Sequence, residues 1–156
     1  MARQIGARLE LPVVHLDLLY WNDKWQKSDL ATFRAKVIAS LNADRWICEG
    51  NYTKQTFDLR LHRADVIIWL DTPRSVCCFR IIERVLSKRR RPDLPAGCRE
   101  TIDIEFMRFI WHSWKFDLSV RPGIEADVHY QQNSSKIVRL RTQEDIKRFL
   151  SSLRSA

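Results

Sequence analysis

Two short apolar segments of the sequence are each followed at once by acidic and polar residues. The segment "LPVVHLD" ends in Asp17, and "RWICEGN" ends in Glu49, Gly50 and Asn51. An acid in this position could act as a base or hold a metal ion beside a phosphate. The alternatives are that Asp17 caps the following turn and that Glu49 is an acidic turn residue. Gly50 would let a ligand approach the backbone closely.

The helix expected after the glycine turn carries arginines that could bind an anion. Arg60 and Arg63 lie on this segment, and the guanidinium of Arg60 could clamp an anionic group of a substrate through two parallel hydrogen bonds. Glu49, at the end of the preceding strand, could hold Mg²⁺ through a water molecule. Arg60 and Glu49, together with Asp17 and Asn51, form the candidate substrate and metal site.

A run of cations ends a later helix and precedes a segment rich in Pro and Gly, "RRRPDLPAGCRE". Cations are stabilised at a helix C-terminus by the macrodipole, and a charged run is commonly a solvated face. The same placement before a loop is typical of a lid that brings guanidinium groups onto transferring phosphates. The residues of this run are Arg84, Lys88, Arg89, Arg90 and Arg91.

Other residues with reactive side chains favour structural interpretations. Asp71 is followed by Thr-Pro, which suits an ordinary strand-to-helix turn. Trp21 and Trp25 could flank a flat ligand, although a core or surface position is favoured. The four cysteines have no zinc spacing and are expected to be reduced thiols. The histidines lie beside no nucleophile and show no metal spacing, so no role is assigned to His15, His62, His112 and His129.

Strand-like and helix-like segments alternate along the chain, which predicts an α/β fold with a parallel sheet. Besides the two strands above, the runs "ADVIIWLDTP" and "KIVRL" are expected to be strands. Ser28 is expected to cap a helix with Leu30, Phe33, Val37 and Leu41 on one stripe. Further helices are expected at residues 2–11, through Phe57 to Leu61, after Pro73, along an apolar stripe from Ile104 to Leu118, and after a capping box of Thr142 and Asp145.

The length of 156 residues suits a single domain, and no apolar run is long enough to span a bilayer. The N-terminus has no secretory signal, so a cytoplasmic protein is expected. The net charge of +8 suggests an anionic partner, which could be a nucleotide, a nucleic acid or only solvent anions.

The order of these motifs resembles one family. The segments "LPVVHLDLLYW", "RWICEGNY", "LRLHRADVIIWLDTPR" and "RRRPDLPAGCRE…FMRFIW" are similar to those of the P-loop kinases related to adenylate kinase, in particular the FlaR-type topology modulation proteins. The resemblance covers nearly the whole chain. It implies a P-loop NTPase fold with helices on both faces of a parallel sheet, and a lid-like segment at about residues 87–100. It also implies ATP, Mg²⁺ and phosphoryl transfer to a small acceptor, or ATP hydrolysis.

The resemblance also implies roles for individual residues. Asp17 would lie near the acceptor, Glu49 near the metal and Arg60 at the acceptor's anionic group, with Arg89, Arg90 and Arg91 in the lid. The family's phosphate-binding motif, G-x-x-x-x-G-K-[ST], does not occur in the 156 residues. The chain is therefore expected to start just after that loop, and to lack the central first strand of the family's sheet. The alternative function is a non-catalytic basic protein that binds nucleic acid.

Overall fold

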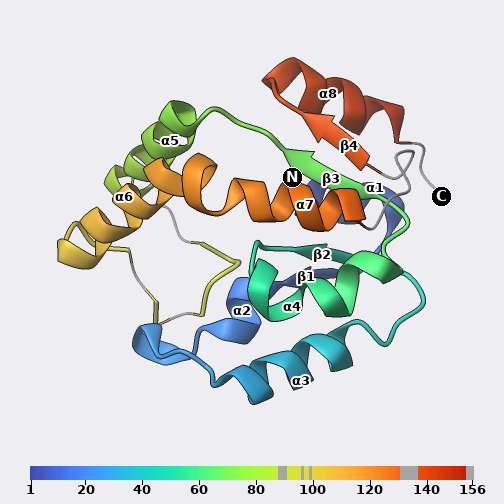
Figure 1. Cartoon of the computed structure of the whole chain (residues 1–156), viewed down its shortest axis with the longest axis horizontal. Coiled ribbons are helices and arrows are strands. Elements are labelled where there is room, and N and C mark those ends of the chain that lie inside the picture. Colours follow the sequence, from blue (N-terminus) through green and yellow to red (C-terminus); the bar gives the residue numbers. More distant parts are fainter. Residues whose placement is uncertain (88–90, 96, 99, 131–136, 154–156) are drawn as a thin grey trace. The chain divides into compact units, whose positions relative to one another are not determined.

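The computed structural model of the chain describes residues 1–87, 91–95, 97–98, 100–130 and 137–153. Short strands alternate with helices, so the α/β class predicted from the sequence is confirmed. Contacts divide the chain, drawn in Figure 1, into two compact units. The first unit holds residues 1–64 with the described parts of 92–98 and 142–156, and the second holds the described parts of 65–91 and 99–141.

Two parallel strands form the sheet of the first unit. β1 (Val13–His15) and β2 (Ile47–Glu49) lie side by side with His15 opposite Glu49 (Figure 1). Helix α1 contacts both strands, α2 contacts α3, and α3 contacts α4. The helical elements of this unit are α1 (Ala2–Leu9), α2 (Leu16–Tyr20), η1 (Asp23–Trp25), α3 (Leu30–Ser40), α4 (Thr53–Arg60), η2 (Leu61–Arg63) and α8 (Gln143–Ser152).

The core of the first unit lies between α2, α3 and the strands. Leu16, Phe33, Val37 and Leu41 are fully buried and pack together. Leu30, predicted to lie on the same stripe, is 57% exposed. The predicted cap of α3 is also wrong by one residue. Asp29 rather than Ser28 caps the helix, because the carboxylate of Asp29 accepts the N–H of Thr32 at 2.9 Å. The Ser28 hydroxyl instead donates to the carbonyl of Leu19.

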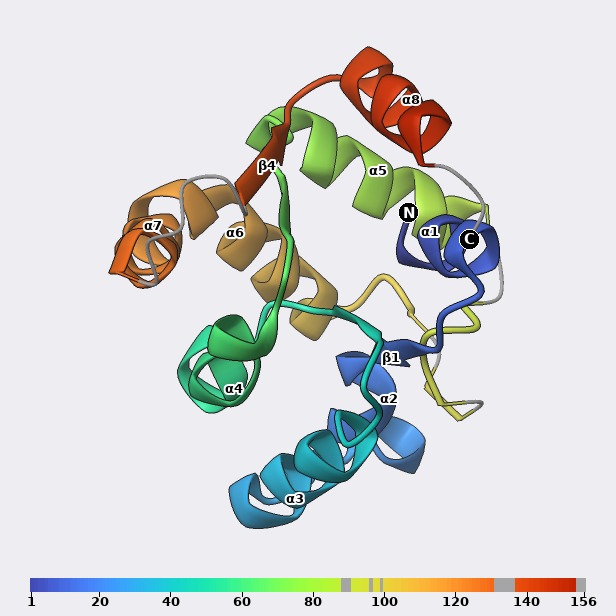
Figure 2. The same cartoon turned by 90° about the vertical axis from the view of Figure 1, so that its right-hand side faces the viewer.

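The second unit is built on another parallel pair. β3 (Ile67–Leu70) and β4 (Ile137–Leu140) pair along their whole length, with Leu70 opposite Leu140. Its helices are α5 (Arg74–Leu86), α6 (Ile104–Ser119) and α7 (Arg121–Tyr130). Figure 2 shows α5 and α6 side by side, and α6 also contacts α7. The sequence did not predict α7, whose early Pro122 fits a first helical turn because no N–H is needed there.

The predicted apolar stripe of α6 does not form a core. Its residues are 41–74% exposed, and the half-buried residues of the helix include Phe106, Ile110 and Phe116 instead. Helix α6 carries apolar side chains on several of its faces. The periodicity of its sequence therefore could not predict which face packs against the rest of the unit. The exposed stripe comprises Ile104, Met107, Trp111, Trp114 and Leu118.

Strand pairing differs from the single sheet expected from the sequence. The described strands form two separate two-stranded sheets, with the orders β1-β2 and β3-β4. Within the described part of the chain, β2 and β3 therefore each pair along one edge only. The capping box of Thr142 and Asp145 is confirmed at the start of α8.

Candidate functional site

The ends of β1 and β2 bring a histidine and a carboxylate together. His15 and Glu49 are opposite each other in the register, and Nδ1 of His15 lies 2.6 Å from Oε1 of Glu49. The His15 side chain is 14% exposed and that of Glu49 is 39% exposed. Both strands run in the same direction, so their carboxyl ends form one edge, where parallel sheets commonly bind ligands. No role was predicted for His15. The pattern that could have indicated its contact is that His15 and Glu49 lie at the ends of two successive strands.

Asp17 lies at the same edge but not on the strand. β1 ends at His15, and Asp17 is in the first turn of α2. Its Oδ1 accepts a hydrogen bond of 2.7 Å from the hydroxyl of Tyr52. Burial, followed by this hydrogen bond, raises the pKa of Tyr52 well above its ordinary value of 10.0. Tyr52 is therefore a neutral hydrogen-bond donor to Asp17.

The turn after β2 is held tightly against the core. Gly50 has a φ of 122°, and a Cβ at this position would lie 2.9 Å from the Cβ of Leu16. Tyr52 has a φ of 31°, which is also in the left-handed region. The backbone therefore bends sharply between Glu49 and α4, and glycine is required at the point of closest approach.

The buried side chain of Arg60 holds this turn through hydrogen bonds to its backbone. It is buried, and its Nη2 donates to the carbonyl of Gly50 at 2.7 Å and to that of Asn51. Its Nε donates to the Thr56 hydroxyl at 3.1 Å. Burial lowers the pKa of Arg60, while neighbouring Cys48 and Glu49 oppose that shift. The observed contacts hold the backbone of the candidate site. The role of Arg60 as a clamp on a substrate anion stays a prediction, as does substrate binding by the exposed Asn51.

The oxygen atoms at this edge suit magnesium held through water more than a protein-enclosed ion. Among the described residues, no group of three or more His, Cys, Asp or Glu side chains could hold a metal ion. Mg²⁺ commonly uses one or two carboxylates, several waters and substrate phosphates. The partly exposed carboxylate of Glu49 fits that pattern, with Oε1 already in contact with His15.

The predicted lid is described only in part. Arg89 and Arg90 lie outside the described residues. Arg91 donates to Glu100 at 3.0 Å, and Arg84 donates to the same carboxylate at 2.8 and 2.5 Å. Glu100 is largely buried, and by accepting from both arginines it connects the end of α5 to the segment that precedes α6. The role of the arginines on a phosphate stays a prediction.

The described residues between 92 and 98 belong to the first unit, where the thiol of Cys98 makes hydrogen bonds. The Sγ of Cys98 donates to the carbonyl of Asn22 at 3.2 Å and accepts the N–H of Trp25 at 3.4 Å. The rings of Trp21 and Trp25 meet edge to face at an interplanar angle of 84°. The two indoles therefore do not form a parallel slot for a flat ligand.

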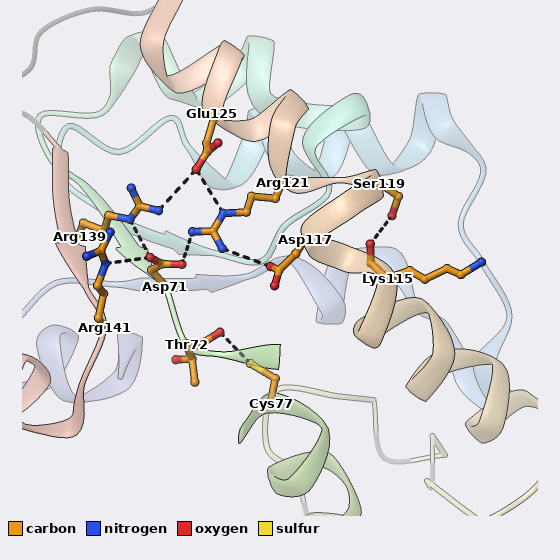
Figure 3. A network of polar contacts seen from close by, with 10 residues as sticks. All are labelled: Asp71, Thr72, Cys77, Lys115, Asp117, Ser119, Arg121, Glu125, Arg139 and Arg141. Carbon is orange, nitrogen blue, oxygen red and sulfur yellow. Dashed lines mark hydrogen bonds and ion pairs between the residues drawn. The ribbon is translucent and has the colours of Figure 1, made fainter. Parts of the chain in front are cut away.

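A second carboxylate at a strand end has different partners. Asp71 follows β3 and accepts from Arg121 at 2.5 Å, from Arg139 at 2.8 Å and from Arg141 at 3.1 Å (Figure 3). Its side chain is 10% exposed. Burial alone would raise the pKa of Asp71, but the hydrogen bonds from Arg139 and Arg141 and the charge of Arg121 outweigh it and lower the pKa.

Further acids balance the charge of this cluster. Asp117 and Glu125 contact Arg121 at 3.3 and 3.2 Å, so three arginines meet three carboxylates (Figure 3). Arg121 and Arg139 also lie over the ring of Trp69. We interpret the Asp71 cluster as a structural brace, in agreement with the interpretation of Asp71 as a turn residue. The sequence did not reveal its arginine partners, although Arg139 and Arg141 have the i, i+2 spacing of one strand face.

Comparison with known proteins gave no relative. No protein-family model matches the chain, and neither a curated protein nor a solved structure matches it significantly. None of the described helices combines the length and apolar character that crossing a bilayer requires.

Proposed function

We propose that this chain carries the acceptor side and the lid of an ATP-dependent phosphoryl-transfer enzyme related to adenylate kinase. The observation that carries the proposal is the edge formed by β1 and β2, where the carboxylates of Asp17 and Glu49 have His15 and Tyr52 as partners. Asp17 and Asn51 would bind the acceptor, Arg60 would support the turn, and Arg89, Arg90 and Arg91 would act from the lid. Glu49 would hold Mg²⁺ through water, and the ion would supply charge neutralisation on the phosphates.

The pairing of β2 is compatible with this assignment. The resemblance places a strand and its phosphate-binding loop beside the strand corresponding to β2. Within the described part of the chain, β2 pairs along one edge only, with β1. A phosphate-binding loop at this point would present backbone N–H groups at the carboxyl edge. The proposal therefore concerns the chain joined to such a strand and loop.

The test compares two proteins. One is the 156-residue chain, and the other carries a strand and a G-x-x-x-x-G-K-[ST] loop ahead of Met1. We expect the longer protein to bind Mg·ATP and turn it over, and substitution of the loop's lysine by alanine to abolish binding. Asp17→Asn in the longer protein should preserve nucleotide binding and slow transfer. Failure of the longer, folded protein to bind Mg·ATP would contradict the proposal.

The same samples test the nucleic-acid alternative. Several of the 27 Lys and Arg residues are paired with carboxylates, among them Arg34, Arg84, Arg91 and Arg121. The guanidinium groups in these ion pairs are less available to contact a phosphate backbone. We therefore expect weak binding of unrelated duplex DNA. Tight binding that falls steeply with salt, together with no ATP turnover, would favour the alternative.

A further inference from the structure

The helix pair of the second unit, α5 and α6, carries a large exposed apolar surface. The exposed stripe of α6 described above is here called the α6 stripe, and its residues are 41–74% exposed. On α5, buried Cys78 and Val85 lie on one face, and apolar residues that are 36–66% exposed lie on the opposite face. These exposed residues form the α5 stripe, which comprises Val76, Phe79, Ile82 and Leu86.

The two stripes adjoin on one side of the helix pair. The guanidinium carbon of Arg74, in the first turn of α5, lies 4.5 Å from the ring centroid of Trp114, which belongs to the α6 stripe. At the other end of α5, Arg84 binds Glu100, which precedes α6. The helices therefore run antiparallel side by side (Figure 2). Helical periodicity then places both stripes on the same side of the pair, away from the more buried face of each helix.

The area of this surface suits a protein–protein interface. Burial of both stripes would remove on the order of 1,000 Å² per chain from water, because they consist of large aliphatic and aromatic side chains. A standard interface buries roughly 800 Å² per partner, whereas the largest apolar patch of a typical monomer is about 300–600 Å². The surface is therefore large enough to hold two proteins together.

The pattern of the two stripes indicates the chemistry of the partner. Residues of the α6 stripe are separated alternately by three and four positions, which is the narrow seam that packs against another helix in a coiled coil. The α5 stripe is interrupted by exposed Glu83, which lies between Phe79 and Leu86 on the helix surface. An anionic lipid surface would repel this carboxylate, and an apolar partner would leave it buried without a cation. The partner should therefore be helical and should carry a cation opposite Glu83.

A second copy of the chain meets both requirements. Arg80 is exposed beside the α5 stripe, and neither Arg80 nor Glu83 forms an ion pair with another described residue. Around a twofold axis, two α5 helices run antiparallel and every contact occurs twice. Contact of Val76 with Leu86 of the second copy sets the register. In that register Arg80 lies beside Glu83 of the second copy.

We propose that the α5 and α6 stripes form the interface of a twofold-symmetric dimer, in which Arg80 of each copy pairs with Glu83 of the other. The apolar stripes supply the buried area, and the two ion pairs fix the register. The dimer requires no nucleotide, so this inference is independent of the proposed function.

Exchange of the two charges tests the dimer. The experiment uses the protein that carries the strand and phosphate-binding loop ahead of Met1, because that protein is expected to be soluble. Sedimentation velocity over a series of concentrations should show a dimer. Arg80→Glu and Glu83→Arg each place like charges across the axis, and each should weaken dimerisation by about tenfold or more. An equimolar mixture of the two single variants should form a heterodimer, and the double variant should dimerise as the parent does.

A substitution within the apolar surface provides a second measurement. Phe79→Asp should yield a monomer, because it places a further carboxylate in the α5 stripe of each copy. The matched control is Leu30→Asp, since Leu30 is also exposed, at 57%, but lies on α3 in the first unit. Leu30→Asp should remain a dimer. Circular dichroism and thermal melting of each variant check that its fold is retained.

The outcomes decide the proposal separately from the proposed function. A monomeric parent at every concentration overturns the dimer, including a monomer that binds vesicles of phosphatidylcholine and phosphatidylserine. Multimers of no defined size that the charge variants do not affect also overturn it, as does a mixture of single variants that forms no heterodimer. A dimer without Mg·ATP turnover leaves this inference standing, whereas a monomer that turns over Mg·ATP overturns this inference alone.

Discussion

The two parallel pairs of strands each end in carboxylates, but those carboxylates have opposite surroundings. At the end of β3, Asp71 is largely buried and receives three guanidinium groups. At the ends of β1 and β2, Asp17 accepts from a tyrosine hydroxyl and Glu49 meets a histidine. Asp71 is surrounded by three guanidinium groups. The hydrogen bond from Tyr52 to Asp17 comes from a neutral hydroxyl, and Glu49 contacts an imidazole and interacts electrostatically with buried Arg60.

This difference shows why an acid at a strand end is an incomplete sign of function. Ionised arginines hold Asp71 in one protonation state, because they lower its pKa and satisfy its oxygen atoms. Such a group stabilises the fold but is poorly placed to take part in a reaction. Asp17, which is hydrogen-bonded to Tyr52, and Glu49, which contacts His15, are the carboxylates proposed to bind the acceptor and Mg²⁺. The partner, more than the acid, distinguishes the brace from the candidate site.

The largest expected effect comes from adding a strand and a phosphate-binding loop ahead of Met1. The added strand would give β2, which pairs along one edge only in the described part of the chain, a second hydrogen-bonded neighbour. Each buried backbone group left unpaired costs about 1–3 kcal/mol, against a total stability of about 5–15 kcal/mol. We therefore expect the 156-residue chain to melt broadly, to be poorly soluble and not to retain ATP. The longer protein should melt cooperatively at a higher temperature.

Thermal melting and ATP binding on the two proteins, measured side by side, check this expectation. A variant of the longer protein with prolines in the added strand is the control, because proline cannot donate to a strand ladder. A sharp melt with tight Mg·ATP binding by the shorter chain would show that the placement of the strand is wrong.

Removal of Asp71 should destabilise the second unit strongly. Asp71→Ala leaves Arg121, Arg139 and Arg141 close together without their shared carboxylate, at a cost of roughly 2–4 kcal/mol. Asp117→Ala is the matched control, since Asp117 contacts only the Arg121 of these three at 3.3 Å and is 35% exposed. That control should cost less than about 1 kcal/mol. Hydrogen exchange of the β3 and β4 amides measures both; equal protection in the two variants would refute the brace.

Lowering the pH should reduce the stability that the Asp71 cluster contributes. The folded-state pKa of Asp71 lies below its ordinary value of 3.8, so its contribution to stability is present above pH 4 and is lost as the pH falls through the folded pKa. Exchange protection of β3 and β4 should fall in this range in the parent, and less so in Asp71→Asn, which no longer titrates there. The same loss of protection in both proteins would assign the acid sensitivity to other groups.

The sequence predicted the strands well because their signals are local. β2, β3 and β4 lie within the predicted segments, and the capping box of α8 is confirmed. Burial was less predictable, because the stripe of α6 depends on which neighbouring element covers it. α7 was missed, and the single expected sheet is two sheets in the described part of the chain.

Partners of the site residues were the least predictable. Asp17 and Glu49 stand out in the sequence because each closely follows an apolar segment. The contact of His15 with Glu49 requires the register of two strands, and the contact of Arg60 with the Gly50 carbonyl requires the fold of α4 around the turn. Neither follows from residue spacing alone. Side-chain partners depend on tertiary structure, and the partners are what separate the candidate site from the Asp71 brace.

The smallest expected effect concerns the hydrogen bond from Tyr52 to Asp17. Tyr52→Phe removes the hydroxyl that donates to Asp17 at 2.7 Å but keeps the ring packed on Phe33 and Tyr20, so it should cost about 1 kcal/mol of stability at neutral pH. The pKa of Tyr52 is raised in the folded state, so its contribution is present below its ordinary value of 10.0 and declines as the pH rises above it. The parent should therefore lose stability above pH 10 more steeply than Tyr52→Phe in urea unfolding.

Tyr20→Phe is the control, because the contacts of Tyr20 with Phe33, Trp21 and Tyr52 are made by its ring. If Tyr20→Phe and Tyr52→Phe respond alike to alkaline pH, the hydrogen bond to Asp17 does not distinguish this edge from the other.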